Sequence, residues 1–585
     1  MPATRKKKKR RLQAAPADAP SRSAKTGGTR GKPPRPMRVG ARLAARRIRV
    51  VAELSGCLDA RRRLRRLARL VERGSREMRR VAFVEGLLGD CLDDAVGDVA
   101  PRERWLACEA VTWGLAWLAR TRRAGGSAGG LLERLVTSAR SAEPGLRARD
   151  TAPARFVVTL ARLFCDIEAC RCLERTAAAA VAEEIGRLVS NDGAVVVSGE
   201  SAGSAAVVER VERWAAVQEI AATAGGPPPW GDASEQRRRL ATATGLRLLG
   251  GRGRILVGPG RQPACRSRRL LESARAGRAA VRRTADLVLR PPHEVAAATA
   301  RRLLPRDLHA ADSATAIIRT GWHRDALRVL VDYREAVPRL EIATGDRLLV
   351  DGAWSWLVTL DGRPLEAEKP WTVAGFESDR KATFLEISAP LGGGLTLERQ
   401  VVVLVRDAVV LLADAVTAPT PPADVPLEIE SAVCLGQSLE AEPGEETREV
   451  IAYDTTMRLM ALPLALPEWT AAPGPGTLRA ADGRLVLRQA SLGGRLYAPL
   501  WFDCDPARIG RPLTWRQLTV ADTRQNLPRH QAAGFRVQAG LEQWLLYRTL
   551  DLPRNRSVLG CNLSCEFLLG RIRKDGEVAR TLEIE

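Results

Sequence analysis

The hydrophobic periodicity of this 585-residue chain changes once, near residue 305, and this change constrains its fold more than any other feature. From Arg42 to about Leu304, apolar residues recur every three or four positions, which predicts amphipathic helices. After Ala310, short apolar or alternating runs recur about every ten residues between Gly and Pro turns, which predicts antiparallel strands. Because the helices come first and the strands afterwards, we expect an α+β multidomain fold rather than an alternating α/β sheet.

Three regions follow from this pattern. Residues 1–40 consist mostly of Lys, Arg, Pro, Gly, Ser and Ala. Such a segment cannot bury enough apolar surface to fold, so we expect a disordered basic tail. Residues 41–304 are predicted to form a helical domain, and residues 305–585 a β-sandwich domain. A chain of this length exceeds what one hydrophobic core usually supports, which also favours two large domains.

The net charge of +24 is concentrated at the N-terminus. Residues 1–80 carry 27 Lys/Arg against 5 Asp/Glu, whereas the other 505 residues carry 65 against 63. The densest basic run is a candidate polyanion-binding tail formed by Arg5, Lys6, Lys7, Lys8, Lys9, Arg10 and Arg11. Nucleic acid, anionic lipid or acidic polysaccharide would bind such a run non-specifically and in a salt-dependent manner. A solvated tail without a dedicated partner is the alternative.

Membrane, secretory and metal-binding signals are missing from the pattern. No run of about 18 apolar residues occurs, so no membrane span is predicted. The basic start has no apolar segment behind it, and we therefore expect a cytoplasmic protein. The 11 cysteines show no paired spacing and are expected to be reduced thiols. Neither a metal site nor another cofactor is predicted from the four scattered histidines, His293, His309, His323 and His530. No particular oligomeric state is indicated.

Three short segments of the sequence are similar to segments of a known protein family. They are Glu183–Gly193 in the helical half, and Ala314–Trp322 and Leu340–Gly352 at the start of the strand half. In their order along the chain and in their residues, these segments resemble the heparinase II/III-like polysaccharide lyases, over roughly residues 170–420. The resemblance implies an incomplete α/α toroid followed by a supersandwich, which is a β-sandwich of stacked antiparallel sheets. It also implies a polysaccharide site in a cleft between the two domains.

The residues that carry the family's chemistry are missing at the matching positions. The resemblance implies a His-Gly-His-Ala-Asp-type motif just before Leu340–Ala343, where this chain has Asp332–Arg339 without a histidine. It also implies a tyrosine acid in the helical half, whereas the first tyrosine here is Tyr333. β-Elimination of a uronic acid needs a base, an acid and a partner for the carboxylate. We therefore expect a heparinase II/III-like protein with eroded catalysis that binds an acidic polysaccharide.

Possible substitutes for the lost groups lie in and near the segment that replaces the histidine motif. Tyr333 is a candidate acid, Arg334 a candidate partner for the substrate carboxylate, and His323 a candidate base. Arg339 and Glu335 are candidate substrate-binding residues. With these groups, an active lyase with substituted catalytic residues is the second hypothesis. The alternatives are a polar strand end with ordinary ion pairs, and a histidine in a surface turn.

Three tryptophans form a further candidate group for substrate binding. Trp354, Trp356 and Trp371 lie close together in the sequence, and aromatic rings stack on the apolar faces of sugars. Packing within the β-domain is the alternative for each ring. A third hypothesis, of a different class, is a nucleic-acid-associated protein that acts through residues 1–40.

Overall fold

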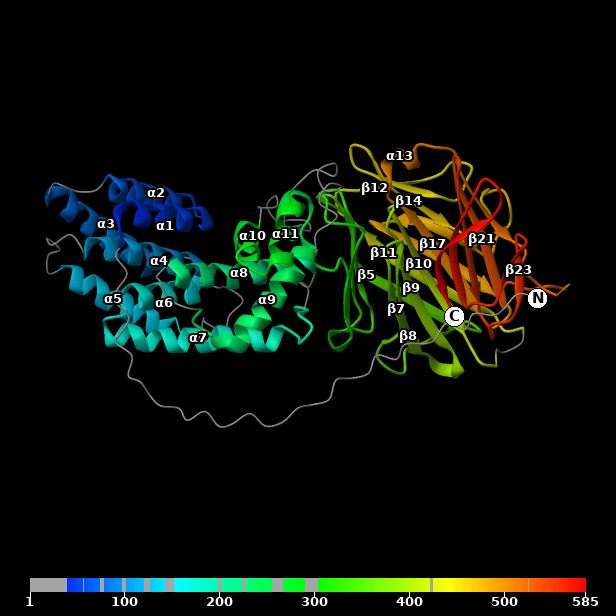
Figure 1. Cartoon of the computed structure of the whole chain (residues 1–585), viewed down its shortest axis with the longest axis horizontal. Helices are drawn as coiled ribbons and strands as arrows, with labels where there is room; N and C mark the ends of the chain where they lie inside the picture. Colours follow the sequence, from blue (N-terminus) through cyan, green and yellow to red (C-terminus); the bar gives the residue numbers. More distant parts are fainter. Residues whose placement is uncertain are drawn as a thin grey trace, which may run out of the picture.

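The computed structural model describes residues 39–585 except 56, 74–77, 97–100, 120–126, 143–151, 198–202, 224–227, 255–266, 290–302, 421–423 and 524. The helices, drawn blue to green, lie at one end of the molecule, and the sheets, drawn green to red, lie at the other (Figure 1). The chain passes once from helices to strands, as the change in periodicity predicted. The basic run Arg5–Arg11 lies outside the described residues.

Amphipathic stripes build the helical domain. In α2 (Leu58–Glu72), Leu64, Leu67 and Val71 are buried at helical spacing. The other helices are α1 (Ala41–Leu54), α3 (Met78–Val96), α4 (Pro101–Leu118), α5 (Ser127–Ser141), α6 (Ala152–Leu163), α7 (Glu168–Leu188), α8 (Ser204–Thr223), α9 (Gly231–Leu248), α10 (Arg268–Arg275) and α11 (Ala279–Val288). α1 packs on α2 and α4, α6 on α4 and α7, and α8 on α9 and α10. This toroid-like array shares one apolar core.

The strands form four antiparallel sheets. A nine-stranded sheet contains β1 (Leu308–Ala310), β2 (Thr315–Arg319), β3 (Leu327–Asp332), β4 (Arg339–Thr344), β5 (Arg347–Leu360), β11 (Leu427–Leu435), β16 (Arg484–Ser491) and β15 (Gly476–Ala481) in that order, with β6 (Arg363–Leu365) paired to β5. An eight-stranded sheet contains β12 (Glu440–Pro443), β13 (Val450–Tyr453), β14 (Met457–Pro463), β17 (Leu496–Asp503), β10 (Val409–Thr417), β9 (Thr396–Leu404), β8 (Ala382–Pro390) and β7 (Thr372–Ser378).

Two smaller sheets complete the β-domain. The five-stranded sheet runs β18 (Leu513–Leu518), β21 (Ala532–Ala539), β22 (Glu542–Thr549), β25 (Phe567–Ile572) and β26 (Val578–Ile584). The four-stranded sheet runs β20 (Gln525–Asn526), β19 (Ala521–Asp522), β23 (Arg556–Val558) and β24 (Cys561–Leu563). A short helix, α13 (Pro506–Ile509), follows β17.

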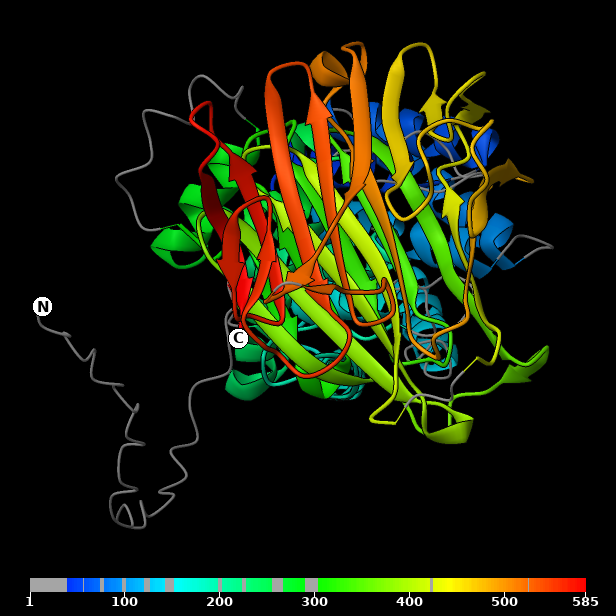
Figure 2. The same ribbon diagram turned by 90° about the vertical axis from the view of Figure 1, so that its right-hand side faces the viewer.

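Apolar cores between successive sheets hold the four sheets in one stack, which is viewed from the β-domain side in Figure 2. Strand β9 contributes side chains to two of these cores. Val401 and Val403 enter the core with the nine-stranded sheet, whereas Val402 and Leu404 enter the core with the five-stranded sheet. A strand buried on both faces needs apolar residues at successive positions, which explains this uninterrupted run. The stack confirms the predicted supersandwich of antiparallel sheets.

The nine-stranded sheet packs against the helices through its first strands. Ile317 of β2 and Leu330 of β3 join the core of the helical domain, together with Trp322 from the turn between these strands. The Trp322 Nε1–H also donates to Leu304 O at 3.2 Å. The two domains therefore share buried apolar surface.

Two buried arginines of the β-domain bind the C-terminal end of α9. Arg319 Nη1 donates to Arg247 O at 2.6 Å and to Leu249 O at 3.0 Å. Arg328 Nη1 donates to Leu248 O. Cations stabilise a helix C-terminus because the last carbonyls lack partners within the helix. The domain junction is therefore specific as well as apolar.

Candidate functional site

A row of charged side chains lies on the strands that face the helices. In the register of β3, β4 and β5, Asp332 lies opposite Arg339, and Glu341 lies opposite Asp351. These residues alternate along β4 with residues such as Leu340, which enters the core between the two largest sheets. Because side chains alternate across a strand, the charged row lies on the helix-facing side of the sheet. Asp332 and Arg339, the first and last residues of the segment that replaces the histidine motif, both belong to this row.

Arg334 connects the charged row to the helical domain. Its guanidinium donates to both carboxylate oxygens of Asp332, at 2.9 Å and 2.5 Å, and to Val197 O at 2.9 Å. The hydrogen bonds to Asp332 raise the pKa of Arg334. The residue predicted to hold a substrate carboxylate thus holds a carboxylate of the chain itself. Glu335, the next residue, is exposed.

Glu341 connects the charged row to the start of α8. Its Oε1 accepts the backbone N–H of Ser204, the first residue of α8, at 2.9 Å and lies 3.4 Å from Arg339 Nε. Gly203 has a φ of +133°, and a Cβ there would lie 2.3 Å from Glu341 Oε1, so this position requires glycine. Arg339 also binds Asp351. Arg334, the candidate partner for the substrate carboxylate, and Arg339, a candidate substrate-binding residue, therefore both form ion pairs within the protein.

Tyr333 points to the other side of the sheet. It is 3% exposed and belongs to the core between the two largest sheets. Its hydroxyl lies 3.0 Å from His309 Nε2, and the His309 ring stacks on Phe376 of β7 with centroids 4.6 Å apart. Burial, and secondarily Asp332, raises the pKa of Tyr333 to about 12. Burial lowers the pKa of His309, and the Asp192 carboxylate of the helical domain opposes this effect.

The His309–Tyr333 pair was not predicted from the sequence. The two residues are 24 positions apart, and the pairing of β1 with β2 and of β2 with β3 brings them together. Chemically, a neutral imidazole can accept a proton, and a phenol with a raised pKa keeps its own. Here the two groups satisfy each other's hydrogen bond. No spacing rule would have found this pair, because it depends on strand register.

His323 lies apart from both groups. It is in the turn between β2 and β3, at the opposite end of β3 from Tyr333. With a rise of about 3.4 Å per residue, β3 separates the two residues by roughly 20 Å. Burial lowers the pKa of His323, and its Nδ1 has no hydrogen-bond partner among the described residues. The structure therefore does not bring Tyr333, Arg334 and His323 together around one substrate.

The three tryptophans occupy packing positions. Trp354 is 1% exposed, and the Arg399 guanidinium lies 3.8 Å from the centroid of its ring, so the ring offers no face to a sugar. Trp356 and Trp371 meet edge to face, and both indole N–H groups donate to Ala336 O, at 3.2 Å and 2.9 Å. They hold the loop between Arg334 and Arg339 in place. Of the three rings, Trp356 is the most accessible.

Comparison with solved structures identifies the architecture. The chain is similar to the heparan sulfate lyase HepC from Pedobacter heparinus, with a TM-score of 0.54, 10% identity, and coverage of 85% of this chain and 84% of that chain. The chain has a heparinase-like polysaccharide lyase fold. The heparinase III BT4657 gene product gives a TM-score of 0.53 at 10% identity, with coverage of 87% and 84%. Another heparinase III gives 0.50 at 9% identity, with coverage of 84% and 83%.

Sequence comparison adds nothing to this result, since no protein-family model and no curated sequence matches the chain. In the described part of the heparinase-like fold, no group of three or more His, Cys, Asp or Glu side chains is placed to hold a metal ion. None of the helices formed by the described residues is long and apolar enough to cross a membrane.

Proposed function

We propose that this protein binds an acidic polysaccharide at the junction of its helical and β-domains and does not cleave it. The heparinase-like fold supports binding, since solved structures of this architecture include a heparan sulfate lyase. An acidic chain would lie along the helix-facing side of β3, β4 and β5, where the charged row is found.

The proposal that the protein does not cleave the polysaccharide rests on the contacts that the candidate catalytic groups make within the fold. β-Elimination requires an acid, a base and a partner for the carboxylate, all aimed at one sugar. Arg334 is bound to Asp332, and Arg339 is bound to Asp351. Tyr333 is buried against His309 on the other side of the sheet. These contacts stabilise the domain junction and the sheets. They also keep the candidate acid and the candidate arginines on different sides of the sheet, so these groups do not face one sugar.

A binding titration tests this proposal. Full-length protein is titrated with heparan sulfate and chondroitin sulfate oligosaccharides, with a neutral oligosaccharide of equal length as the comparison. We expect saturable, salt-sensitive binding of the acidic chains, weakened by Arg339→Gln. Arg479→Gln is the matched control, because Arg479 is an exposed arginine on β15, at the opposite edge of the same sheet. Equal affinity for the neutral chain would exclude an acidic-glycan site.

A second candidate function is a lyase that uses the His309–Tyr333 pair. The observation in its favour is that the Tyr333 hydroxyl lies 3.0 Å from His309 Nε2, so a possible base and a possible acid are in direct hydrogen-bond contact. Formation of unsaturated uronate by the wild type, with loss of product in both Tyr333→Phe and His309→Gln, would establish this function in place of the first.

A further inference from the structure

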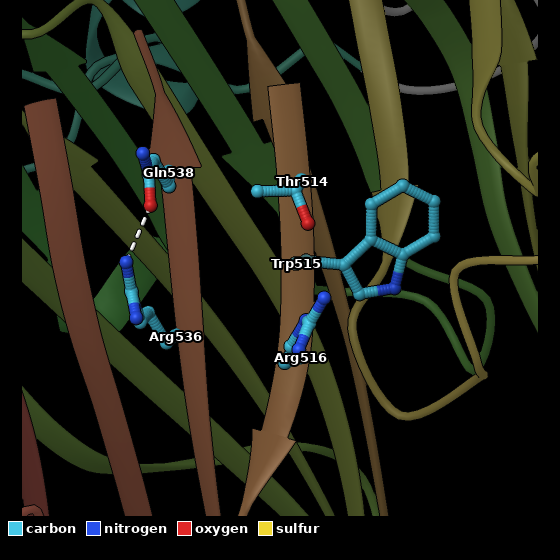
Figure 3. Close-up of a pocket in the computed structure, with 5 residues that line it drawn as sticks. All are labelled: Thr514, Trp515, Arg516, Arg536 and Gln538. Atoms are coloured by element: carbon cyan, nitrogen blue, oxygen red, sulfur yellow. Dashed lines mark hydrogen bonds between the residues drawn. The ribbon is translucent and has the colours of Figure 1, made fainter. Parts of the chain in front are cut away.

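The outer face of the five-stranded sheet carries two arginines side by side. Arg516 of β18 and Arg536 of β21 are directly opposite in the antiparallel register. Figure 3 shows both guanidinium groups at the same level of the sheet, with Thr514 and Gln538 forming the next pair along the strands. This face lies two sheets away from the domain junction, roughly 20 Å at the usual inter-sheet spacing of about 10 Å.

These four residues line a cavity of about 280 Å³, together with Trp515, which points into the core between the eight- and five-stranded sheets. The small four-stranded sheet covers the adjoining part of the same face, where Val520 and Val558 lie against Gly534. The cavity thus begins where that cover ends. Its volume is just below the range of about 300–1,000 Å³ usual for small-molecule sites, and it suits one ring-sized ligand.

The two arginines of the cavity differ from other arginines of this domain in having no ion pair among the described residues. Neither Arg516 nor Arg536 forms an ion pair with any carboxylate in the described part of the chain. Like charges directly opposite each other on a sheet destabilise it. Other arginines of this domain, such as Arg508 and Arg571, are paired with Asp503 and Asp407 respectively.

Neighbouring groups orient the cavity for an anion. Arg536 Nη2 donates to Gln538 Oε1, and Gln538 Nε2 donates to Gly540 O at 3.0 Å, so Gln538 fixes the Arg536 guanidinium. Thr514 donates its hydroxyl hydrogen to Glu468 at 2.6 Å, which places one carboxylate at the edge of the cavity. Glu468 offsets at most one of the two positive charges. Trp469, the next residue, is 52% exposed.

We propose that this cavity is a second binding site, which takes an oxyanion group on a ligand of about one sugar ring. A guanidinium presents two parallel N–H donors that match a carboxylate, sulfate or phosphate. Two such groups on adjacent strands hold the anion from both sides, and the anion relieves their mutual repulsion. The site is independent of the polysaccharide site proposed at the domain junction.

Titration of the full-length protein with single sugars tests this site. Glucuronate, glucose 6-sulfate and glucose 6-phosphate distinguish the three oxyanions, and glucose is the neutral comparison. We expect saturable binding of at least one anionic sugar, weakened about tenfold or more in Arg516→Gln and in Arg536→Gln. The control Arg479→Gln keeps wild-type affinity.

The melting temperature provides a second readout. In buffer without multivalent anions, Arg516→Gln is expected to melt no lower than the wild type, because it removes a like-charge contact. The anionic sugar that binds raises the melting temperature of the wild type but not that of the Arg516→Gln/Arg536→Gln double variant. Glucose binding as tightly as every anionic sugar, or wild-type affinity in the double variant, would overturn the proposal.

Discussion

Removing the Glu341 carboxylate should loosen the start of α8 from the β-domain. Glu341 is 3% exposed, and its Oε1 accepts the Ser204 N–H at 2.9 Å. In Glu341→Leu this buried N–H loses its acceptor, at a cost of about 1–3 kcal/mol. The favourable interaction of an anion with the helix N-terminus, about 0.3–1 kcal/mol, is lost as well. Arg339 keeps Asp351 as its partner. We therefore expect a total cost of about 1.3–4 kcal/mol.

Glu341→Gln separates the hydrogen bond from the charge. Its amide oxygen can still accept the Ser204 N–H, so only the charge interaction is lost, and we expect a cost of about 1 kcal/mol or less. Gly203→Ala should act through the same contact, because its Cβ would lie 2.3 Å from Glu341 Oε1. The effects of Gly203→Ala and Glu341→Leu should therefore be less than additive in the double variant.

Hydrogen exchange is the suitable assay, because a two-domain protein need not unfold in a single step. Amides in the first turns of α8 should exchange about tenfold or more faster in Glu341→Leu, as a loss of about 1.3 kcal/mol or more implies. In Glu341→Gln they should stay within about fivefold of the wild type. Exchange in β21 and β22, far from this contact, serves as the internal control. Unchanged exchange of α8 in Glu341→Leu would refute this account of the junction.

Three further predictions concern other parts of the molecule. Because burial lowers the pKa of His309, the unfolded state takes up this proton first as the pH falls below about 6.5. Stability is then lost as the pH falls through the folded-state pKa, and His309→Gln should flatten urea midpoints measured between pH 5 and 7.5. An unchanged pH slope would contradict this. Arg399→Met leaves Asp414, 2% exposed, without its 2.6 Å partner, and should cost about 3–5 kcal/mol in urea unfolding. Arg399→Met/Asp414→Leu should recover most of this loss, and an equally unstable double variant would argue against the ion-pair explanation. Deleting residues 1–40 should abolish DNA retention at low salt, because this segment holds the basic run that would bind nucleic acid. Equal retention by the truncated chain would exclude the tail as the DNA-binding segment.

Local patterns predicted the architecture well. The change from helical to alternating periodicity is visible in short windows, and it separates the two domains. The run Val401–Leu404 lies on a strand that is buried on both faces, as stacked sheets require. The change of periodicity depends on neighbours in sequence, so the sequence alone was sufficient to infer it.

The side-chain arrangement could not be inferred in the same way. His309 meets Tyr333 through the register of three strands, and Glu341 meets Ser204 across 137 positions and two domains. The alternation of side chains along β4 and β5 predicts that each strand has two faces, but it does not predict which face packs against the helices. For Trp354 the sequence therefore left both sugar binding and packing open, and in the structure this ring lies in the core.

The proposal that the protein binds an acidic polysaccharide without cleaving it is tested most directly by recovering the bound ligand. Full-length protein is incubated at a one-to-one ratio with a heparan sulfate oligosaccharide of defined length, and the released ligand is weighed by mass spectrometry. A one-to-one ratio detects even a single turnover. We predict that the oligosaccharide is bound and returns at its original mass. Shorter products with an unsaturated end, absent when Tyr333→Phe is used, would contradict this account.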